Sequence, residues 1–119
     1  MAESREIIFK VDLDADKVPS NISWHASDSP FQEPQPCKSM MVSLWDSKDK
    51  NTLSIDLWTK DMPVQEMRVF TAQVLEKLGD TFERATRNQD LGAMLRKFSA
   101  QFRVKIQEIE KKEKDMETN

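Results

Sequence analysis

The first half of the chain alternates apolar and polar residues with a period of two in four short segments. This alternation is typical of strands that bury one face and expose the other. The segments predict strands at residues 7–13, 22–26, 40–45 and 53–58. Polar segments separate the first from the second and the third from the fourth, so we expect two antiparallel hairpins.

The apolar positions also predict how the strands pair. In the first hairpin we expect Val11 opposite Trp24, because this register keeps the apolar side chains on one side of the pair. In the second hairpin a four-residue turn at residues 48–51 sets Leu44 opposite Ile55.

A proline-rich segment, residues 28–37, lies between the two predicted hairpins and has prolines at positions 30, 34 and 36. Proline removes a backbone donor and holds the preceding residue in an extended conformation. We expect this segment to be an exposed connector.

After Pro63 the apolar positions recur at steps of three and four residues, which is typical of amphipathic helices. Pro63 suits a first helical turn, and Asn88 or Asp90 can cap a second helix. The spacing predicts a helical hairpin over residues 63–110. Its apolar positions are Met67, Phe70, Val74, Leu78, Phe82, Ala85, Leu91, Met94, Leu95, Phe98, Phe102, Ile106 and Ile109. The tail at residues 111–119 has little apolar surface to offset the entropy of ordering, so we expect a fraying helix end or disorder.

Two helices that follow four strands predict an α+β fold in two layers. We expect a four-stranded antiparallel sheet packed on one face by a C-terminal pair of antiparallel helices. The length of 119 residues fits a single domain. Its parts are the sheet at residues 5–59, which includes the connector at 28–37, the helical hairpin at 63–110 and the charged tail at 111–119.

The sheet face turned away from the helices is the candidate functional surface. The period of two places Met41, Trp45, Trp58 and His25 on this outer face. Large aromatic side chains are enriched at protein interfaces, so we predict an interaction surface for a protein partner or a second copy. The alternative is that the connector or the tail folds over the two indole rings and forms a second small core.

Composition narrows the functional classes. The chain has 18 Lys and Arg against 21 Asp and Glu, a net charge of -3, which argues against nucleic-acid binding. It contains no apolar run long enough to span a membrane, and its first residues lack the layout of a secretory signal. One cysteine cannot form an internal disulfide, which fits a reducing compartment. We expect a cytoplasmic protein without membrane insertion.

Catalytic and metal-binding patterns are weak. A D-x-D-x-D run at residues 12–16 is similar to the start of a calcium loop, but Lys17 and Ser23 stand where that loop needs glycine and glutamate. His25 and Cys37 are the only residues of their kinds, and the sequence has no nucleophile elbow or phosphate-binding loop. We therefore predict no catalytic, cofactor-binding or metal-binding residues, and a protein that is not an enzyme.

Four blocks of sequence carry a family resemblance: WHASDS at residues 24–29, SLWD at 43–46, KNTLSIDLWTKDMPV at 50–64 and DTFERAT at 80–86. The chain resembles the gliding motility protein GldC family over roughly residues 6–102. The resemblance implies an accessory component of the bacterial gliding machinery, encoded beside a lipoprotein of the same apparatus. It implies no known enzymatic activity and no cofactor.

The residues and the resemblance together predict a non-catalytic accessory protein of gliding motility that acts through protein–protein contacts on the outer sheet face. The predicted partner is a protein of the gliding apparatus, and a homodimer is also open. The alternative is a carrier of a small apolar ligand, with a pocket between sheet and helices. That pocket would be lined by residues such as Met40, Leu57, Phe70 and Phe82.

Overall fold

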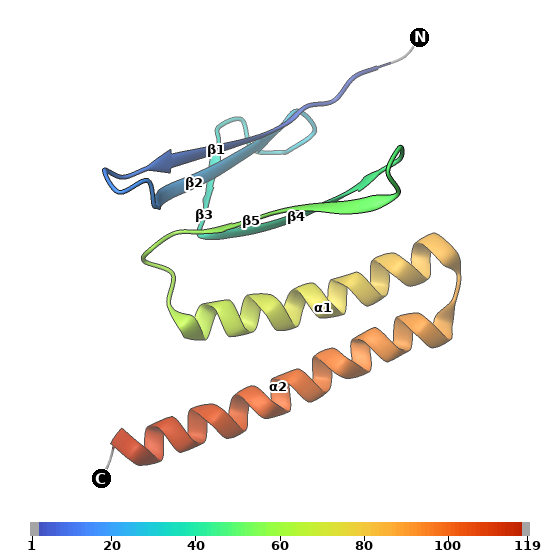
Figure 1. Ribbon diagram of the computed structural model, residues 1–119. Coiled ribbons are helices and arrows are strands. Elements are labelled where there is room, and N and C mark those ends of the chain that lie inside the picture. The colour runs from blue at the N-terminus through green and yellow to red at the C-terminus, as the bar shows by residue number, and fades with distance from the viewer. Residues whose placement is uncertain (1–2, 118–119) are drawn as a thin grey trace. The chain divides into compact units, whose positions relative to one another are not determined.

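The computed structural model describes residues 3–117, and the chain forms two compact units (Figure 1). The first unit ends at Met62 and consists of strands, and the second begins at Pro63 and consists of two helices. The predicted α+β class is therefore confirmed. The packing of the helices on a sheet face and the assignment to a single domain stay predictions.

The first sheet has three antiparallel strands in the order β1-β2-β3. They are β1 (Ile7–Leu13), β2 (Pro19–Ala26) and β3 (Gln35–Cys37). Val11 lies opposite Ile22, two residues away from its predicted partner Trp24, so the predicted register is wrong. A shift of two residues leaves every side chain on its predicted face.

The turn between β1 and β2 explains this shift. The side chain of Asp14 accepts hydrogen bonds from the backbone N–H groups of Asp16 (2.9 Å) and Val18 (3.1 Å), which closes a tight turn. Lys17 adopts the left-handed conformation with φ of 63°. Strand β2 consequently begins at Pro19, earlier than the alternation of apolar residues indicated.

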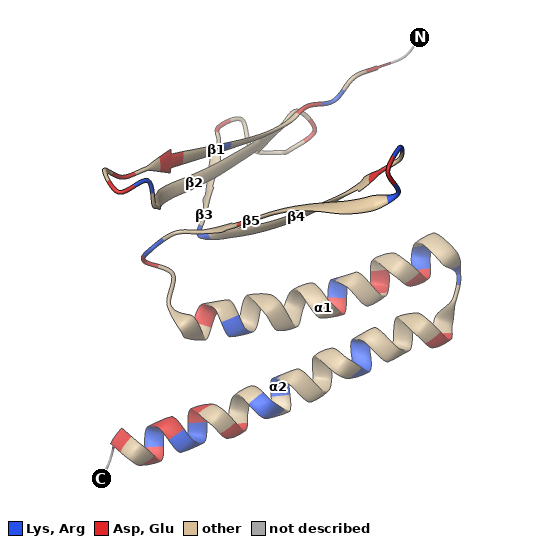
Figure 2. Cartoon of the chain, viewed as in Figure 1, with Lys and Arg blue, Asp and Glu red and all other residues tan. Residues whose placement is uncertain are grey.

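The second sheet is a separate two-stranded hairpin, so the prediction of one four-stranded sheet is wrong. It consists of β4 (Ser39–Asp46) and β5 (Asn51–Trp58). Leu44 lies opposite Leu53 and Val42 opposite Ile55, again two residues from the predicted register. The Asp46 carboxylate accepts the backbone N–H of Asp49 at 2.9 Å, which fixes the turn one residue earlier than predicted. Figure 2 shows that charged residues gather at this turn.

The division into two sheets arises at Lys38, the single residue between β3 and β4. Strand β3 pairs with β2, whereas β4 pairs with β5. The prediction that all of residues 28–37 form an exposed connector is therefore wrong at its C-terminal end. Pro36 is tolerated in β3 because this strand is short and lies at the edge of its sheet.

Backbone hydrogen bonds tie the two sheets together beside Lys38. Its carbonyl oxygen accepts the N–H of Thr59 at 2.8 Å, and the carbonyl oxygen of Pro19 accepts the N–H of Lys60 at 3.1 Å. The segment that follows β5 thus bonds to both sheets. We call these four residues the sheet junction.

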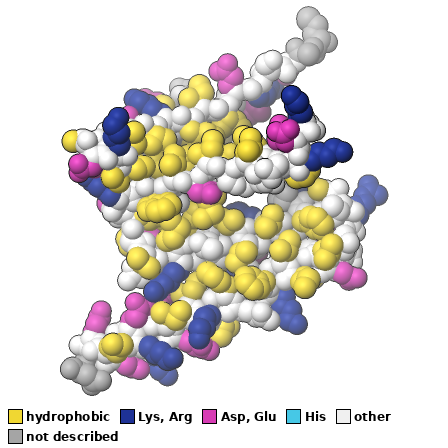
Figure 3. Space-filling view, viewed as in Figure 1, with side chains coloured by type: hydrophobic (Ala, Val, Ile, Leu, Met, Phe, Trp, Pro, Cys, Tyr) yellow, Lys and Arg dark blue, Asp and Glu magenta, His cyan; other side chains and the backbone are white. Residues whose placement is uncertain are grey.

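The buried side chains of the β unit surround the sheet junction. Ile22 is 0% exposed and lies opposite Cys37, the neighbour of Lys38. Met40 and Thr59 are also buried, and Met40 follows Lys38 by two residues. The core of this unit is small, and many of its large apolar side chains remain exposed. On the face seen in Figure 3, hydrophobic side chains gather over the strands.

The remaining part of the proline-rich segment folds against β2. The ring of Phe31 meets the ring of Trp24 edge to face, with centroids 6.3 Å apart and an interplanar angle of 87°. This geometry is favourable for aromatic pairs. A single aromatic contact therefore helps to hold the connector against its sheet.

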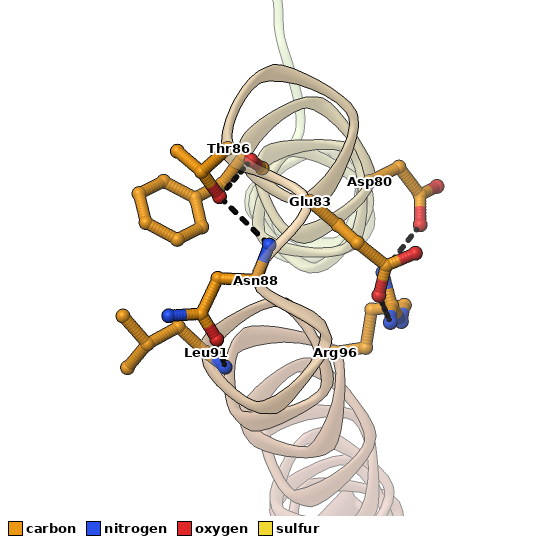
Figure 4. Close-up of polar contacts among 7 residues, drawn as sticks. Asp80, Glu83, Thr86, Asn88, Leu91 and Arg96 are labelled. Carbon is orange, nitrogen blue, oxygen red and sulfur yellow. Dashed lines mark hydrogen bonds and ion pairs between the residues drawn. The ribbon is translucent and has the colours of Figure 1, made fainter.

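The second unit is the predicted helical hairpin of α1 (Val64–Thr86) and α2 (Gln89–Glu117). Arg87 adopts the left-handed conformation and ends α1. The Asn88 side chain accepts the backbone N–H of Leu91 at 3.0 Å, so the predicted cap is confirmed (Figure 4). Thr86 accepts the N–H of Asn88 at 3.1 Å, which closes the turn.

Helix α2 continues through most of the segment predicted as a frayed or disordered tail. Arg68 of α1 donates a hydrogen bond to Glu113 at 2.8 Å and lies 3.7 Å from Glu110. These ion pairs connect the charged end of α2 to α1, which a search for apolar positions does not reveal. Residues 118–119 of the predicted tail lie outside the described part of the chain.

Small residues bring the two helices close together. Ala72 and Gly79 of α1 and Gly92 and Ser99 of α2 are buried and are seven residues apart on each helix. The Ser99 hydroxyl donates a hydrogen bond to the backbone oxygen of Ala72 at 2.7 Å. A Cβ atom on Gly79 would lie 2.8 Å from the backbone oxygen of Gly92. The two helices are therefore so close at these positions that even a methyl group on Gly79 would collide with the backbone of the other helix.

Ion pairs cross the same helical interface. Arg96 of α2 contacts Asp80 at 3.1 Å and Glu83 at 2.7 Å, both on α1 (Figure 4). The hydrogen bond that Arg96 donates to Glu83, followed by the one that it donates to Asp80, raises the pKa of Arg96. Arg103 and Glu76 form a further pair at 3.3 Å. These contacts fix the alignment of the helices along the interface.

The sheet junction can be tested with Ile22→Ala. Removing buried methyl groups from a fully enclosed site should lower the free energy of unfolding by about 2 to 5 kcal/mol. Ile8→Ala is the matched control, because Ile8 lies on the other face of the same sheet and is 54% exposed. It should change stability by about 0.5 kcal/mol or less in urea unfolding. Equal effects of the two substitutions would contradict a core centred on the junction.

The helical interface can be tested with Gly79→Ala. Alanine improves helix propensity by about 1 kcal/mol, but overpacking against a rigid neighbour costs about 1 to 3 kcal/mol. Because the atom that the new methyl group meets belongs to the Gly92 backbone, it cannot rotate away. We expect a net loss of about 1 to 2 kcal/mol in urea unfolding. A stabilised Gly79→Ala protein would show that the helices are farther apart.

Candidate interaction surface

One face of the β4–β5 hairpin carries three of the four residues predicted to form the interaction surface, and we call this face, defined by Met41, Trp45 and Trp58, the outer face of the hairpin. Residues alternate between faces along each strand, and the register sets Met41 opposite Asp56, Trp45 opposite Thr52 and Ser39 opposite Trp58. Met41, Trp45 and Trp58 therefore lie on one face. Trp45 is 67% exposed and Trp58 is 55% exposed.

The two tryptophans lie at opposite ends of this face. Trp45 is next to the turn, and Trp58 is the last residue of β5. Six positions along the ladder separate Trp45 from Ser39, the partner of Trp58. At about 3.3 Å per residue, the indoles are separated by roughly 20 Å. They form two patches instead of one aromatic cluster.

Two cross-strand pairs of the outer face lie between the two tryptophans: one consists of small polar residues and the other is Met41 with Asp56. Ser43 and Ser54 form a cross-strand pair in the middle of the outer face, and Thr52 lies opposite Trp45. Short hydroxyl side chains leave the strands accessible to a partner that lies flat on them. The sequence search for large aromatic residues could not identify this central strip.

Trp58 lies next to a shallow hollow of about 220 Å³ that ends at the sheet junction. This hollow is lined by Val18, Pro19, Asp56, Leu57, Trp58 and Lys60. Its wall combines an indole ring and aliphatic carbon with one acidic and one basic side chain. The Trp58 end of the face can therefore accept both apolar and polar groups.

His25 lies in the other sheet, so the structure does not place it on the face that carries the tryptophans. It is opposite Ile8 in the β1–β2 pair and lines a hollow of about 260 Å³. That hollow is lined by Ile8, Lys10, Ser23, Trp24, His25, Gln32 and Pro34. Period-two reasoning gave the facing of His25 within its own strand but could not tell that its strand belongs to a separate sheet.

The acidic run near the first turn has a structural role through Asp14. The Lys60 ammonium group donates a hydrogen bond to the Asp14 carboxylate at 2.9 Å. This contact, together with the Val18 N–H, lowers the pKa of Asp14. In the same region the Thr59 hydroxyl donates to Asp61 at 2.6 Å and lowers the pKa of that carboxyl group. Both carboxylates stabilise the chain at the sheet junction.

Groups that could carry metal or thiol chemistry are sparse in the described residues. Residues 3–117 contain no cluster of three or more His, Cys, Asp or Glu side chains arranged to hold a metal ion. Partial burial raises the pKa of the Cys37 thiol, so the protonated form is favoured. Cys37 lies opposite Ile22, while His25 projects from the other face of β2.

The comparison with known protein families identifies the family of this chain. The sequence model of the family described as "Gliding motility-associated protein GldC-like" matches residues 19–108. The chain belongs to the GldC-like family. The match contains β2 to β5, all of α1 and most of α2, so it includes the whole outer face of the β4–β5 hairpin. No curated protein and no solved structure matches the chain.

Membership of the GldC-like family associates the chain with gliding motility and confirms the resemblance seen in the sequence. Within residues 3–117, neither helix combines the length and the apolar character needed to cross a membrane. The cytoplasmic location stays a prediction.

The Asp14–Lys60 contact predicts a pH-dependent contribution to stability. Because the pKa of Asp14 is lowered in the folded state, the contact stabilises the protein above the unfolded pKa near 3.8. This contribution disappears as the pH falls through the folded pKa. Lys60→Gln should therefore lower stability at pH 7 and match the wild type at strongly acidic pH.

Urea unfolding at a series of pH values measures this difference. Lys48→Gln is the control, because it removes the same charge from the turn of the other hairpin. A difference between Lys60→Gln and wild type that stays constant down to strongly acidic pH would exclude ionised Asp14 as its source.

Proposed function

We propose that this GldC-like protein is a non-catalytic accessory component of the gliding machinery that acts through protein–protein contacts. The contact surface is the outer face of the β4–β5 hairpin, with Trp45 as its main anchor. The 67% exposed indole of Trp45 is the observation that carries the proposal. A partner that covers such a ring gains much of its binding energy from one side chain.

The composition of the outer face supports this proposal. Trp45, Met41 and Trp58 provide apolar area, and Ser43 and Ser54 provide hydrogen-bonding groups between them. Interfaces are rich in tryptophan and methionine and poor in charged residues at their centre. Asp56 is the one acidic or basic residue among the outward-facing positions of the paired strands.

The absence of catalysis is part of the proposal and is supported by the sequence. The chain has one histidine and one cysteine, and the two lie on opposite faces of the first sheet. They cannot form a nucleophile and base pair of the Cys–His kind. The other predicted role, a carrier of a small apolar ligand, stays a prediction.

Complementation in a gliding bacterium tests the role. The gene is deleted from the bacterium that encodes the protein, and wild type or Trp45→Ser/Trp58→Ser is restored at equal abundance. We expect the wild type to restore gliding and the double variant to restore it poorly. Leu53→Ser/Ile55→Ser is the matched control and should behave like the wild type, because both residues lie on the opposite face of the same hairpin and are 55% and 50% exposed.

Circular dichroism of the purified variants separates contact from folding. The tryptophan variant should retain the helix and strand signals of the wild type. The proposal fails if a folded tryptophan variant restores full gliding, or if deletion of the gene leaves gliding unchanged. An unfolded tryptophan variant would assign the indoles to the core and also overturn it.

A further inference from the structure

Strand β4 has a free edge. It pairs with β5 on one side, and no other strand among residues 3–117 is hydrogen-bonded to its second side. Free edges expose backbone donors and acceptors that can pair with another chain. Natural proteins usually protect such edges with charged residues, proline, bulges or short strands.

The other edge strands of the β unit, β1, β3 and β5, carry protection within the strand, which in β5 is the charge of Asp56. Strand β1 contains Lys10 and an irregularity between Asp12 and Leu13, and β3 is three residues long and contains Pro36. Residues 39–45 of β4 have the sequence SMMVSLW, without charge, proline or glycine. Lys38 precedes β4 and Asp46 ends it, and Figure 2 shows that charged residues gather at the turn that follows β4.

The hydrogen bond from the Thr59 N–H to the Lys38 carbonyl oxygen shows which residues of β4 direct their backbone groups toward β5 and which direct them toward the free edge. Lys38 and Thr59 continue the register of the β4–β5 pairs, and their backbone groups face each other. Every second residue along β4 repeats this direction. The backbone groups that point toward β5 are therefore those of Lys38, Met40, Val42 and Leu44. Backbone orientation alternates along an antiparallel strand. The N–H and carbonyl groups of Met41, Ser43 and Trp45 therefore face the free edge.

We propose that a second copy of the chain adds its β4 to this edge in the antiparallel direction and forms a symmetric dimer. A two-fold axis at Ser43 sets Ser43 opposite Ser43 of the second copy and Met41 opposite Trp45 of the second copy. These pairs join residues whose backbone groups face the edge, so each of them exchanges two hydrogen bonds.

This register also matches the side chains. It places the Met41 thioether beside an indole ring, which is a favourable contact. On the other face it places Val42 opposite Leu44 of the second copy. The two neighbouring symmetric registers would set Trp45 opposite Ser39 or opposite Ser43 and lose the contact between Met41 and Trp45. A second copy is the favoured occupant because residues 39–45 carry no charge that would repel the same residues of another copy, and because Met41 of each copy meets Trp45 of the other.

Ser43→Pro tests the edge directly. Proline removes the N–H that faces the free edge and leaves the bonds between β4 and β5 in place. Ser54→Pro is the matched control, because Ser54 lies opposite Ser43 and directs its N–H to the outer edge of β5. Ser43→Glu is a second variant, which sets two like charges opposite each other only in the dimer.

Sedimentation equilibrium of the purified full chain, from about 1 µM to about 1 mM, measures the mass against 13.9 kDa for one chain. We expect a dimer whose dissociation constant rises at least about tenfold in Ser43→Pro and Ser43→Glu and is unchanged in Ser54→Pro. Trp45→Ser should weaken it as well. Circular dichroism identifies any variant that fails to fold, and Ser43→Glu then replaces Ser43→Pro.

A monomer over the whole concentration range would overturn the proposal. Dimers that persist in Ser43→Glu, or that are lost in Ser54→Pro alone, would place the contact elsewhere. Addition of a strand from a different protein in place of a second copy would appear as a monomer that changes mass only in a mixture. The dimer shares Trp45 with the proposed function, but it is measured without any gliding component, so each can fail separately.

Discussion

The β unit depends on one set of backbone hydrogen bonds, at the sheet junction. Lys38 ends one sheet and begins the other, and Thr59 and Lys60 bond to both. Because Ile22 and Met40 are buried beside this point, the junction also determines where the small core lies. The direction of the β4–β5 hairpin, and hence the face that carries Trp45, follows from this constraint.

The helical unit is held together by a different principle. Its interface consists of small residues at intervals of seven, and the ion pairs of Arg96 and Arg68 connect one helix to the other. Close approach of the backbones replaces interdigitation of large side chains at this seam. The larger apolar residues of both helices are therefore available for contacts away from the seam.

Local periodicity predicted much of this fold. The two hairpins, the common face of Trp45 and Trp58, the helical hairpin and the Asn88 cap all depend on spacing within one segment, which the sequence displays. The registers were wrong by two residues because turn geometry at Asp14 and Asp46 decides them. The separation into two sheets depends on which strands pair across the Lys38 bend, and periodicity contains no signal for that choice.

The sequence predicted three residues of the candidate surface, but it predicted neither their spacing nor that His25 lies in the other sheet. Met41, Trp45 and Trp58 share a face as expected, but the length of the hairpin separates the indoles by roughly 20 Å. This separation means that one small binding partner can reach a single tryptophan. A single protein that contacts both indole rings must therefore extend along the whole length of the hairpin.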